Sequence, residues 1–164
     1  MSAYAEICSL FEARQKMEEE YSTAAYTQLL TFVELFEFYI GCETKERVVP
    51  LRIDEDGLPL PDQTAPFRFV DHKLIAAACV YTEDKSAFVH IPLSVKPLSL
   101  VECFLEIGYG TDGVKQFHVN FSYGAIGMKQ SGSDNALSYL EAMFREKVAS
   151  DAFRLEDTPP TESE

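Results

Sequence analysis

The stretch Leu29-Leu-Thr-Phe-Val-Glu-Leu-Phe-Glu-Phe-Tyr-Ile40 decides the fold of this chain. Read at helical spacing, its polar side chains fall on one narrow stripe that begins just before it, at Thr27, Thr31, Glu34 and Glu37. The remaining circumference is apolar, and a helix with so thin a polar stripe must be buried on most sides. A membrane-spanning helix needs about 20 apolar residues, and this run is shorter. We therefore predict a helix wrapped by a sheet or covered by a partner.

The segment before this stretch predicts more helix. Residues 2–40 contain no glycine or proline, and Ser2 can cap the first turn. One continuous helix would be about 57 Å long at 1.5 Å per residue, which exceeds the width expected for a domain of this size. We therefore favour a break near residues 18–23, where Ser22 or Thr23 can cap a second helix. The alternative is a single helix that projects and pairs with another chain.

The rest of the chain reads as strands followed by a helix. Pro50 confines the strand expected at residues 47–53 to a sheet edge, because proline cannot donate to a ladder. Residues 74–81 are apolar on both faces, which favours a central strand over a turn of buried helix. The other expected elements are strands at residues 67–70, 87–93 (ended by Pro92 and Pro97), 101–107 and 117–123, and a helix from Asp134 to about Ala149.

Two segments with alternating side chains predict a hairpin. In residues 101–107 and 117–123, apolar and polar side chains alternate along the chain. Both apolar sets must lie on one face, so the numbers of paired residues must sum to an even number. A three-residue loop at residues 111–113 meets this condition and pairs Ile107 with Phe117. The outer-face pairs in this register are Glu106 with His118 and Phe104 with Asn120.

These elements predict an α+β fold. An N-terminal helix or helical pair and a C-terminal helix would pack on a mainly antiparallel sheet of about five or six strands. Residues 1–150 should form a single domain, and the acidic residues 151–164, which include Pro159 and Pro160, should form a largely disordered tail. A homodimer is also expected, because so wide an apolar helix is hard to bury within one small domain.

The charge balance favours a basic protein as the partner. The formal charge is −13, from 14 Lys and Arg against 27 Asp and Glu. Nucleic acids and anionic membranes are bound through basic surfaces, so this balance argues against both. A basic protein surface is favoured, because complementary fields speed encounter. The alternative is that the acidity only keeps the protein soluble.

The cysteines and the N-terminus point to the cytoplasm. Cys8, Cys42, Cys79 and Cys103 are spread singly, as small hydrophobes are in a reducing compartment. No pair has the short spacing of zinc ligands, so neither a metal nor a cofactor is predicted. The N-terminus lacks a basic residue followed by an apolar run, so no signal peptide is expected.

Two surfaces are candidates for binding the basic partner. One is an acidic helix face that carries a run of three glutamates and a fourth glutamate before it. The other is the outer hairpin face, where an aromatic side chain between two carboxylates has the composition of an interface anchor with a charged rim. If a helix covers that sheet face, the second idea fails. The candidate residues are Glu12, Glu18, Glu19, Glu20, Glu102, Phe104 and Glu106.

Weaker signals concern small ligands and catalysis. The glycine-rich residues 124–133 lead into a helix N-terminus, where anions bind, and the candidate anion-binding residues are Lys129, Gly132 and Ser133. This segment lacks the spacing of a P-loop. A histidine beside a carboxylate, as in His118 and Glu106, is the arrangement of a general base. No nucleophile adjoins His118, so no catalytic residue is assigned. Residues 54–57 resemble part of a calcium-binding loop. The residues around them do not have the twelve-residue spacing of ligands that such a loop requires.

Three classes of function follow. The favoured class is a small acidic, non-enzymatic protein-binding module, such as an inhibitor, an immunity or anti-defence protein, or a secretion-chaperone-like adaptor, that recognises a basic protein surface. The second class is a ligand-binding domain or enzyme with a pocket between the helix and a curved sheet. The third class is a structural subunit of an assembly, with residues 29–40 buried in the interface.

Overall fold

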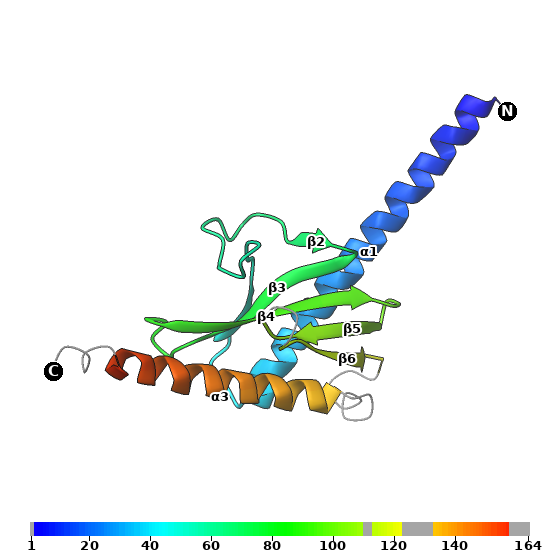
Figure 1. Ribbon diagram of the computed structural model, residues 1–164. Helices are drawn as coiled ribbons and strands as arrows, with labels where there is room; N and C mark the ends of the chain where they lie inside the picture. Colours follow the sequence, from blue (N-terminus) through cyan, green and yellow to red (C-terminus); the bar gives the residue numbers. More distant parts are fainter. Residues whose placement is uncertain (1, 110–112, 123–132, 158–164) are drawn as a thin grey trace.

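The computed structural model describes residues 2–109, 113–122 and 133–157, and these form an α+β molecule (Figure 1). The helices are α1 (Ala3–Tyr39) and α3 (Ser133–Asp157). The strands are β1 (Val48–Leu51), β2 (Arg68–Val70), β3 (Lys73–Tyr81), β4 (Phe88–Pro97), β5 (Glu102–Ile107) and β6 (Lys115–Asn120). They form one six-stranded antiparallel sheet, so the predicted fold class is confirmed.

The sheet is built around β3, as its apolar sequence predicted. The strand order is β1-β3-β4-β5-β6, and the short β2 pairs with the start of β3 on the same edge as β1. Pro50 therefore lies in an edge strand, as expected. The turn between β2 and β3 consists of Asp71 and His72, which both have positive φ, at 53° and 67°. Asp and His tolerate this conformation better than most residues, which suits a tight hairpin.

The predicted end of β4 was wrong. The strand passes through Pro92 and continues to Pro97. The carbonyl oxygen of Pro92 accepts a hydrogen bond from the backbone N–H of Gly108 at 3.0 Å, so the proline nitrogen faces the same side, toward β5. Because β5 ends at Ile107, the missing N–H of Pro92 removes no bond from a ladder, and the proline is tolerated there.

The predicted hairpin register was wrong by two residues, although its parity was right. Leu105 pairs with Phe117, whereas the prediction paired Ile107 with Phe117. The connection between β5 and β6 is longer than the predicted three residues, which moves β6 by one full repeat and keeps the apolar side chains on the core face. On the outer face, Phe104 pairs with His118, Glu102 with Asn120, and Glu106 with Gln116.

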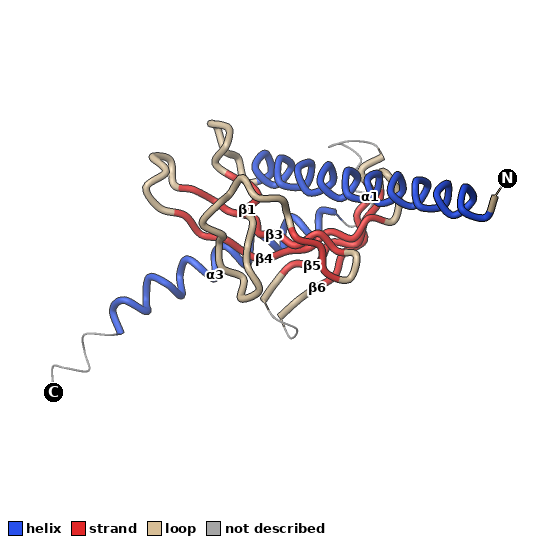
Figure 2. Tube along the Cα trace, turned by 90° about the horizontal axis from the view of Figure 1, so that it is seen from above, coloured by secondary structure: helices blue, strands red, loops and turns tan. Residues whose placement is uncertain are grey.

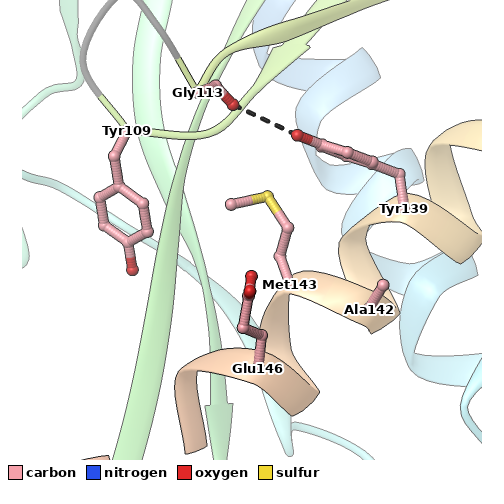
Figure 3. Close-up of a pocket in the computed structure, with 6 residues that line it drawn as sticks. All are labelled: Tyr109, Gly113, Tyr139, Ala142, Met143 and Glu146. Carbon is pink, nitrogen blue, oxygen red and sulfur yellow. Dashed lines mark hydrogen bonds between the residues drawn. The ribbon is translucent and has the colours of Figure 1, made fainter. Parts of the chain in front are cut away.

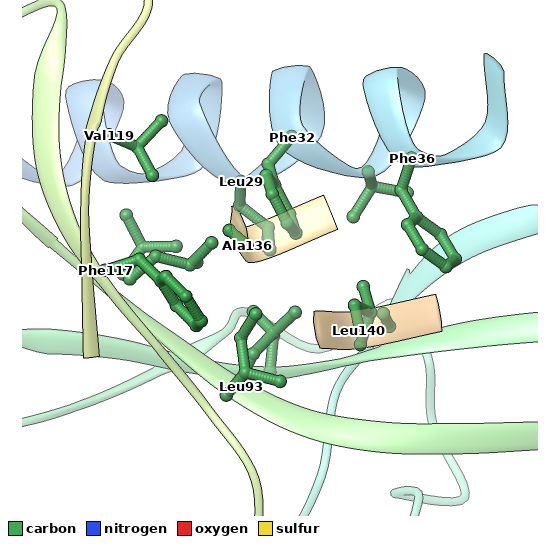
Figure 4. Packing of buried hydrophobic residues seen from close by; sticks show 14 of the residues in the cluster. Leu29, Phe32, Phe36, Leu93, Phe117, Val119, Ala136 and Leu140 are labelled. Carbon is green, nitrogen blue, oxygen red and sulfur yellow. The ribbon is translucent and has the colours of Figure 1, made fainter. Parts of the chain in front are cut away.

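Both helices cover one face of the sheet and share its core. Figure 4 shows Leu29, Phe32 and Phe36 of α1 facing the sheet beside α3. The Phe36 and Phe144 rings stack with centroids 5.6 Å apart, which joins the two helices. On the opposite face, a second cluster covers the middle of β3, and its buried members are Leu51, Ile53, Ala77 and Cys79.

Helix α1 is continuous, so the favoured break near residues 18–23 is wrong. Ser2 caps its start, where its hydroxyl oxygen accepts a hydrogen bond from the Ala5 N–H at 3.1 Å. Nothing in residues 18–23 interrupts the backbone ladder, and serine or threonine caps a helix only where the chain leaves it. The helix ends before Gly41, which has a φ of +80°.

Helix α1 does not lie wholly on the sheet, because part of it projects beyond the sheet edge. In Figures 1 and 2 its N-terminal half extends past the edge of the sheet, away from the rest of the described chain. Tyr21 marks the point of departure, because its hydroxyl donates to the His72 carbonyl oxygen at 2.5 Å. The C-terminal half is buried on one side rather than on most sides, and Phe38 is 81% exposed.

Helix α3 is longer than predicted. It begins at Ser133, next to the expected Asp134, and runs to Asp157 instead of ending near Ala149. Residues 150–157 contain neither glycine nor proline, and the first helix-breaking residue after them is Pro159. Glu141 and Arg145, one turn apart on this helix, form an ion pair at 2.8 Å. Residues 158–164 lie outside the described residues, so the disordered tail stays a prediction.

Candidate functional site

A groove lies where α1 leaves the sheet, between the helix and the connection from β4 to β5. It consists of two adjoining hollows of about 280 and 410 Å³ that share Glu20, Ala24 and Leu100. We call it the α1 groove. The groove is lined on one side by residues of α1, which are Met17, Glu19, Glu20, Tyr21, Thr23, Ala24 and Thr27. On the other side it is lined by Pro97 at the end of β4 and by Leu98, Ser99 and Leu100 of the connection.

The sides of the α1 groove are apolar and open to solvent. Leu100 is 77% exposed, although large aliphatic side chains are usually withdrawn from water. Leu98 and Met17 are also exposed, on either side of the hollow. A concave apolar surface of this kind is typical of a protein-binding site rather than of bare surface.

The rim of the α1 groove is acidic. Glu19 and Glu20 line it, and neither has an ion-pair partner among the described residues. Glu18 pairs with Arg14 at 3.3 Å, one turn earlier on the helix. Glu12 is exposed further along the projecting half. Carboxylates without internal partners remain available to a basic group from another molecule.

A buried glutamine fixes the groove. The Gln28 side-chain amide donates to the carbonyl oxygens of Ser99, at 2.9 Å, and Glu102, at 3.2 Å. The Ser99 hydroxyl oxygen in turn accepts hydrogen bonds from the N–H groups of Val101 and Glu102. These bonds hold the connection against α1, so Leu98 and Leu100 are presented by a fixed turn.

The second predicted surface, the outer face of the hairpin, is also accessible. No helix among the described residues covers it, because α1 and α3 both pack on the opposite face. Phe104 lies beside His118, with ring centroids 5.7 Å apart. The His118 Nε2 atom is 3.3 Å from a carboxylate oxygen of Glu102, so the predicted pairing of His118 with Glu106 is corrected.

The carboxylates of this outer face are already satisfied within the chain. Glu106 accepts a hydrogen bond from the Lys73 ammonium at 2.8 Å and further ones from Ser94 and Gln116. The Lys73 contact is the main cause that holds the pKa of Glu106 below its ordinary value. Glu102 is engaged by His118 and by Asn120. Less negative charge is therefore left for a partner here than at the α1 groove.

No protein-family model, curated protein or solved structure matches this chain.

The remaining histidines have local structural contacts. A ring nitrogen of His90 lies 3.0 Å from the Gly57 carbonyl oxygen, which ties the turn at residues 54–57 to β4. His72 lies in the β2–β3 turn and contacts the Tyr21 ring edge-on. Within residues 2–109, 113–122 and 133–157, no three His, Cys, Asp or Glu side chains are placed to hold a metal ion.

The thiols of Cys42, Cys79 and Cys103 are not activated as nucleophiles. Burial raises the pKa of Cys79 to about 11 and that of Cys103 to about 12. Burial, followed by the charge of Glu37, also raises the pKa of Cys42. A thiol with a raised pKa stays protonated near neutral pH and reacts slowly. The description of Cys79 and Cys103 as small buried hydrophobes is confirmed.

A further hollow of about 570 Å³ lies between α3 and the start of the β5–β6 connection (Figure 3). Tyr139 donates a hydrogen bond to the Gly113 carbonyl oxygen at 3.2 Å, and Met143 lies between Tyr139 and Tyr109 in this view. Two tyrosines near a carboxylate, that of Glu146, resemble the composition of a cation-binding cage.

The chain's own lysines already occupy this cage. The Lys147 ammonium lies 5.4 Å from the centroid of the Tyr109 ring, and Lys115 lies at the same distance from Tyr139. An external cation would have to displace them, so the hollow is a weaker candidate than the α1 groove. Lys129 and Gly132 lie outside the described residues, as does the side chain of Ser133, so the anion site stays a prediction.

Sequence reasoning found one side of the groove and missed the other. The glutamate run was recognised from its charge. Leu98 and Leu100 were not, because nothing in the sequence shows that the connection from β4 to β5 folds against α1. The available signal was a pair of leucines between two strands, in Pro97-Leu-Ser-Leu100, where turns usually carry polar residues.

Proposed function

We propose that this protein is a non-enzymatic binding module whose α1 groove takes up a basic, amphipathic segment of another protein. The observation that carries the proposal is the exposed Leu100, which lines a groove whose rim carries Glu19 and Glu20. An apolar side chain of the partner would fill the hollow, and lysine or arginine side chains beside it would meet the rim.

The charge of the whole chain supports this choice of partner. A net charge of −13 attracts basic proteins over a distance of about one Debye length, roughly 8–10 Å at physiological salt. The same charge repels nucleic acids and anionic membranes. Within the described residues, no helix combines the length and apolar character that a membrane crossing requires. We place the module in the cytoplasm as part of the proposal.

The two other classes of function have weaker support. A pocket between α1 and the sheet would need free space, and the middle of that interface is packed with buried apolar side chains (Figure 4). A hollow of about 500 Å³ is present at its end, where Phe36 and Tyr39 of α1 meet Val80 of β3 and the helix α3. A structural subunit with residues 29–40 in its interface would need that part of α1 to be uncovered. Leu29, Phe32 and Phe36 are instead buried within the chain itself.

Affinity capture with three baits tests the proposal. The baits are the wild-type chain, Leu100→Asp, and Phe104→Ala, each immobilised and exposed to lysate of the native cell. We expect one basic protein to be retained in stoichiometric amount by the wild type and by Phe104→Ala, and to be lost with Leu100→Asp. Leu100 is exposed, so the substitution should leave the fold intact, which circular dichroism checks.

The Leu100→Asp bait also separates specific binding from general charge attraction. It adds a negative charge, so a protein held only by the net charge would bind it at least as well as the wild type. Retention of the same protein on all three baits would refute the groove. Loss with Phe104→Ala alone would move the site to the outer face of the hairpin.

A further inference from the structure

The projecting half of α1 carries an apolar stripe that nothing in the described chain covers. Leu10 is 69% exposed and Phe11 is 59% exposed, and Tyr4, Ile7 and Met17 are also exposed. All five lie before Tyr21, where the helix leaves the sheet. A monomer seldom leaves so many large apolar side chains in water along one helix, so this stripe is the mark of an interface.

The stripe continues the face that α1 buries in the core. An α-helix repeats its orientation every 18 residues, which is five turns of 3.6 residues. Ile7 therefore points in the same direction as the buried Ala25, and Phe11 in the same direction as the buried Leu29. The sequence keeps one apolar face over the whole helix, although the chain's own sheet covers only the second half.

The local charge favours a second copy of this chain over another charged partner. Residues 3–17 contain Glu6 and Glu12 against Arg14 and Lys16, so two acidic and two basic groups cancel. The whole chain, by contrast, carries −13. A neutral segment at the tip of an acidic molecule is the place where two such molecules meet with the least repulsion.

The area of the stripe is sufficient for a dimer. Two aromatic and three aliphatic side chains on each copy would remove on the order of 500 Å² per copy from water. The total, on the order of 1,000 Å², reaches the lower limit for a specific interface. The association should therefore be reversible in the micromolar range.

An antiparallel arrangement fits the residues best. If paired numbers sum to 21, Leu10 meets the partner's Phe11 and Tyr4 meets the partner's Met17, and Glu6 comes near the partner's Lys16. This arrangement opposes the two helix dipoles and places the two acidic bodies at opposite ends. Its one poor match sets Ile7 against the partner's Arg14, whose head group is turned aside toward Glu18.

We infer that the protein forms a two-fold homodimer through the N-terminal half of α1, with the two apolar stripes packed antiparallel. The interface adjoins the α1 groove and shares Met17 with it. Leu10 and Phe11, at the centre of the interface, do not line the groove. The inference does not depend on the proposed function.

Sedimentation velocity of the full chain between low and high micromolar concentration tests the dimer. We expect a species of twice the 18.5 kDa chain mass in the wild type. Leu10→Glu and Phe11→Glu should each raise the dissociation constant at least about tenfold, because a buried carboxylate would lack a partner. Phe38→Glu is the control, since it replaces an aromatic that is even more exposed, at 81%, at the other end of α1 and should dimerise like the wild type.

A substitution that should strengthen the dimer is the second part of the test. Arg14→Leu should tighten the dimer several-fold, because it replaces the one poor match in the stripe. A wild type that is monomeric at every concentration, or a dimer that survives Leu10→Glu, would overturn the inference. Leu10 does not line the α1 groove, so the Leu10→Glu chain should still retain the basic protein in the affinity capture. Failure of the dimer can therefore be distinguished from failure of the proposed function.

Cross-linking tests the orientation. In a Cys8→Ser background, chains with Tyr4→Cys are mixed with chains with Met17→Cys under oxidising conditions. The antiparallel arrangement predicts disulfide-linked dimers that contain one chain of each kind. Chains with Tyr4→Cys that link to one another would show a parallel pair instead and would refute the arrangement.

Discussion

At the scale of single residues, buried or half-buried polar side chains fix the positions of turns by binding their backbone carbonyl groups. Gln28 is 2% exposed and is the link between α1 and the β4–β5 connection. His90 and Tyr21 have similar roles, because each binds a backbone carbonyl of a turn. None of these contacts is visible in the sequence, since the partner groups are 33 to 74 residues away.

Gln28→Ala should destabilise the protein by about 1–2 kcal/mol. The substitution leaves two carbonyl oxygens without their donor, and the loss is moderated because the Gln28 Oε1 atom is itself buried without a partner in the described chain. Urea unfolding measures the change. Thr23→Ala, at an exposed position on the same helix, is the control and should keep the wild-type midpoint. Equal midpoints for the two variants would refute the role of Gln28.

Glu106 should contribute to the pH dependence of stability. Its folded pKa is lowered, chiefly by the hydrogen bond from Lys73, so the folded state favours the ionised carboxylate. The contribution is full above the unfolded pKa of about 4.3 and is lost as the pH falls through the lower folded pKa. Glu106→Gln should therefore lower Tm at pH 7 and approach the wild-type Tm at strongly acidic pH. A Tm difference that does not change with pH would contradict this.

At the scale of elements, the type and position of the helices and strands were predicted from the sequence more accurately than their lengths. The Ser2 cap, the edge position of Pro50 and the central strand β3 follow from local chemistry, and all three were predicted correctly. The continuity of α1 was considered only as the alternative to a break, and the length of the β5–β6 connection was predicted wrongly. Both depend on how far one element extends relative to another, which no local pattern fixes.

The two halves of α1 should differ in their importance for stability. Phe32 is 0% exposed, so Phe32→Ala should cost about 3–5 kcal/mol. Deletion of residues 2–16 should change Tm by less than about 2 °C at low micromolar concentration, because those residues have few contacts with the sheet. Thermal unfolding measures both. A large loss on deletion would mean that the projecting half supports the fold.

At the scale of the whole molecule, charge and shape divide α1 into separate surfaces. Its second half belongs to the core, its middle lines the acidic groove, and its first half carries a neutral apolar stripe. The charge of −13 and the glutamate run are the features of the sequence on which the proposal of a basic partner rests. The sequence did not indicate the groove, because that requires the β4–β5 connection to fold against the helix.

The rate of association between this protein and the captured basic protein, measured against salt, tests the central claim most directly. The comparison is between the wild type and a variant with Glu18, Glu19 and Glu20 all changed to Lys. Exposed charges steer encounter, and the Debye length falls from about 10 Å at 0.1 M salt to about 3 Å at 1 M. We expect the wild-type association rate to fall at least about tenfold over this range and to approach the slower, less salt-dependent rate of the variant. Equal rates for the two proteins at low salt, with both folds intact, would contradict the account.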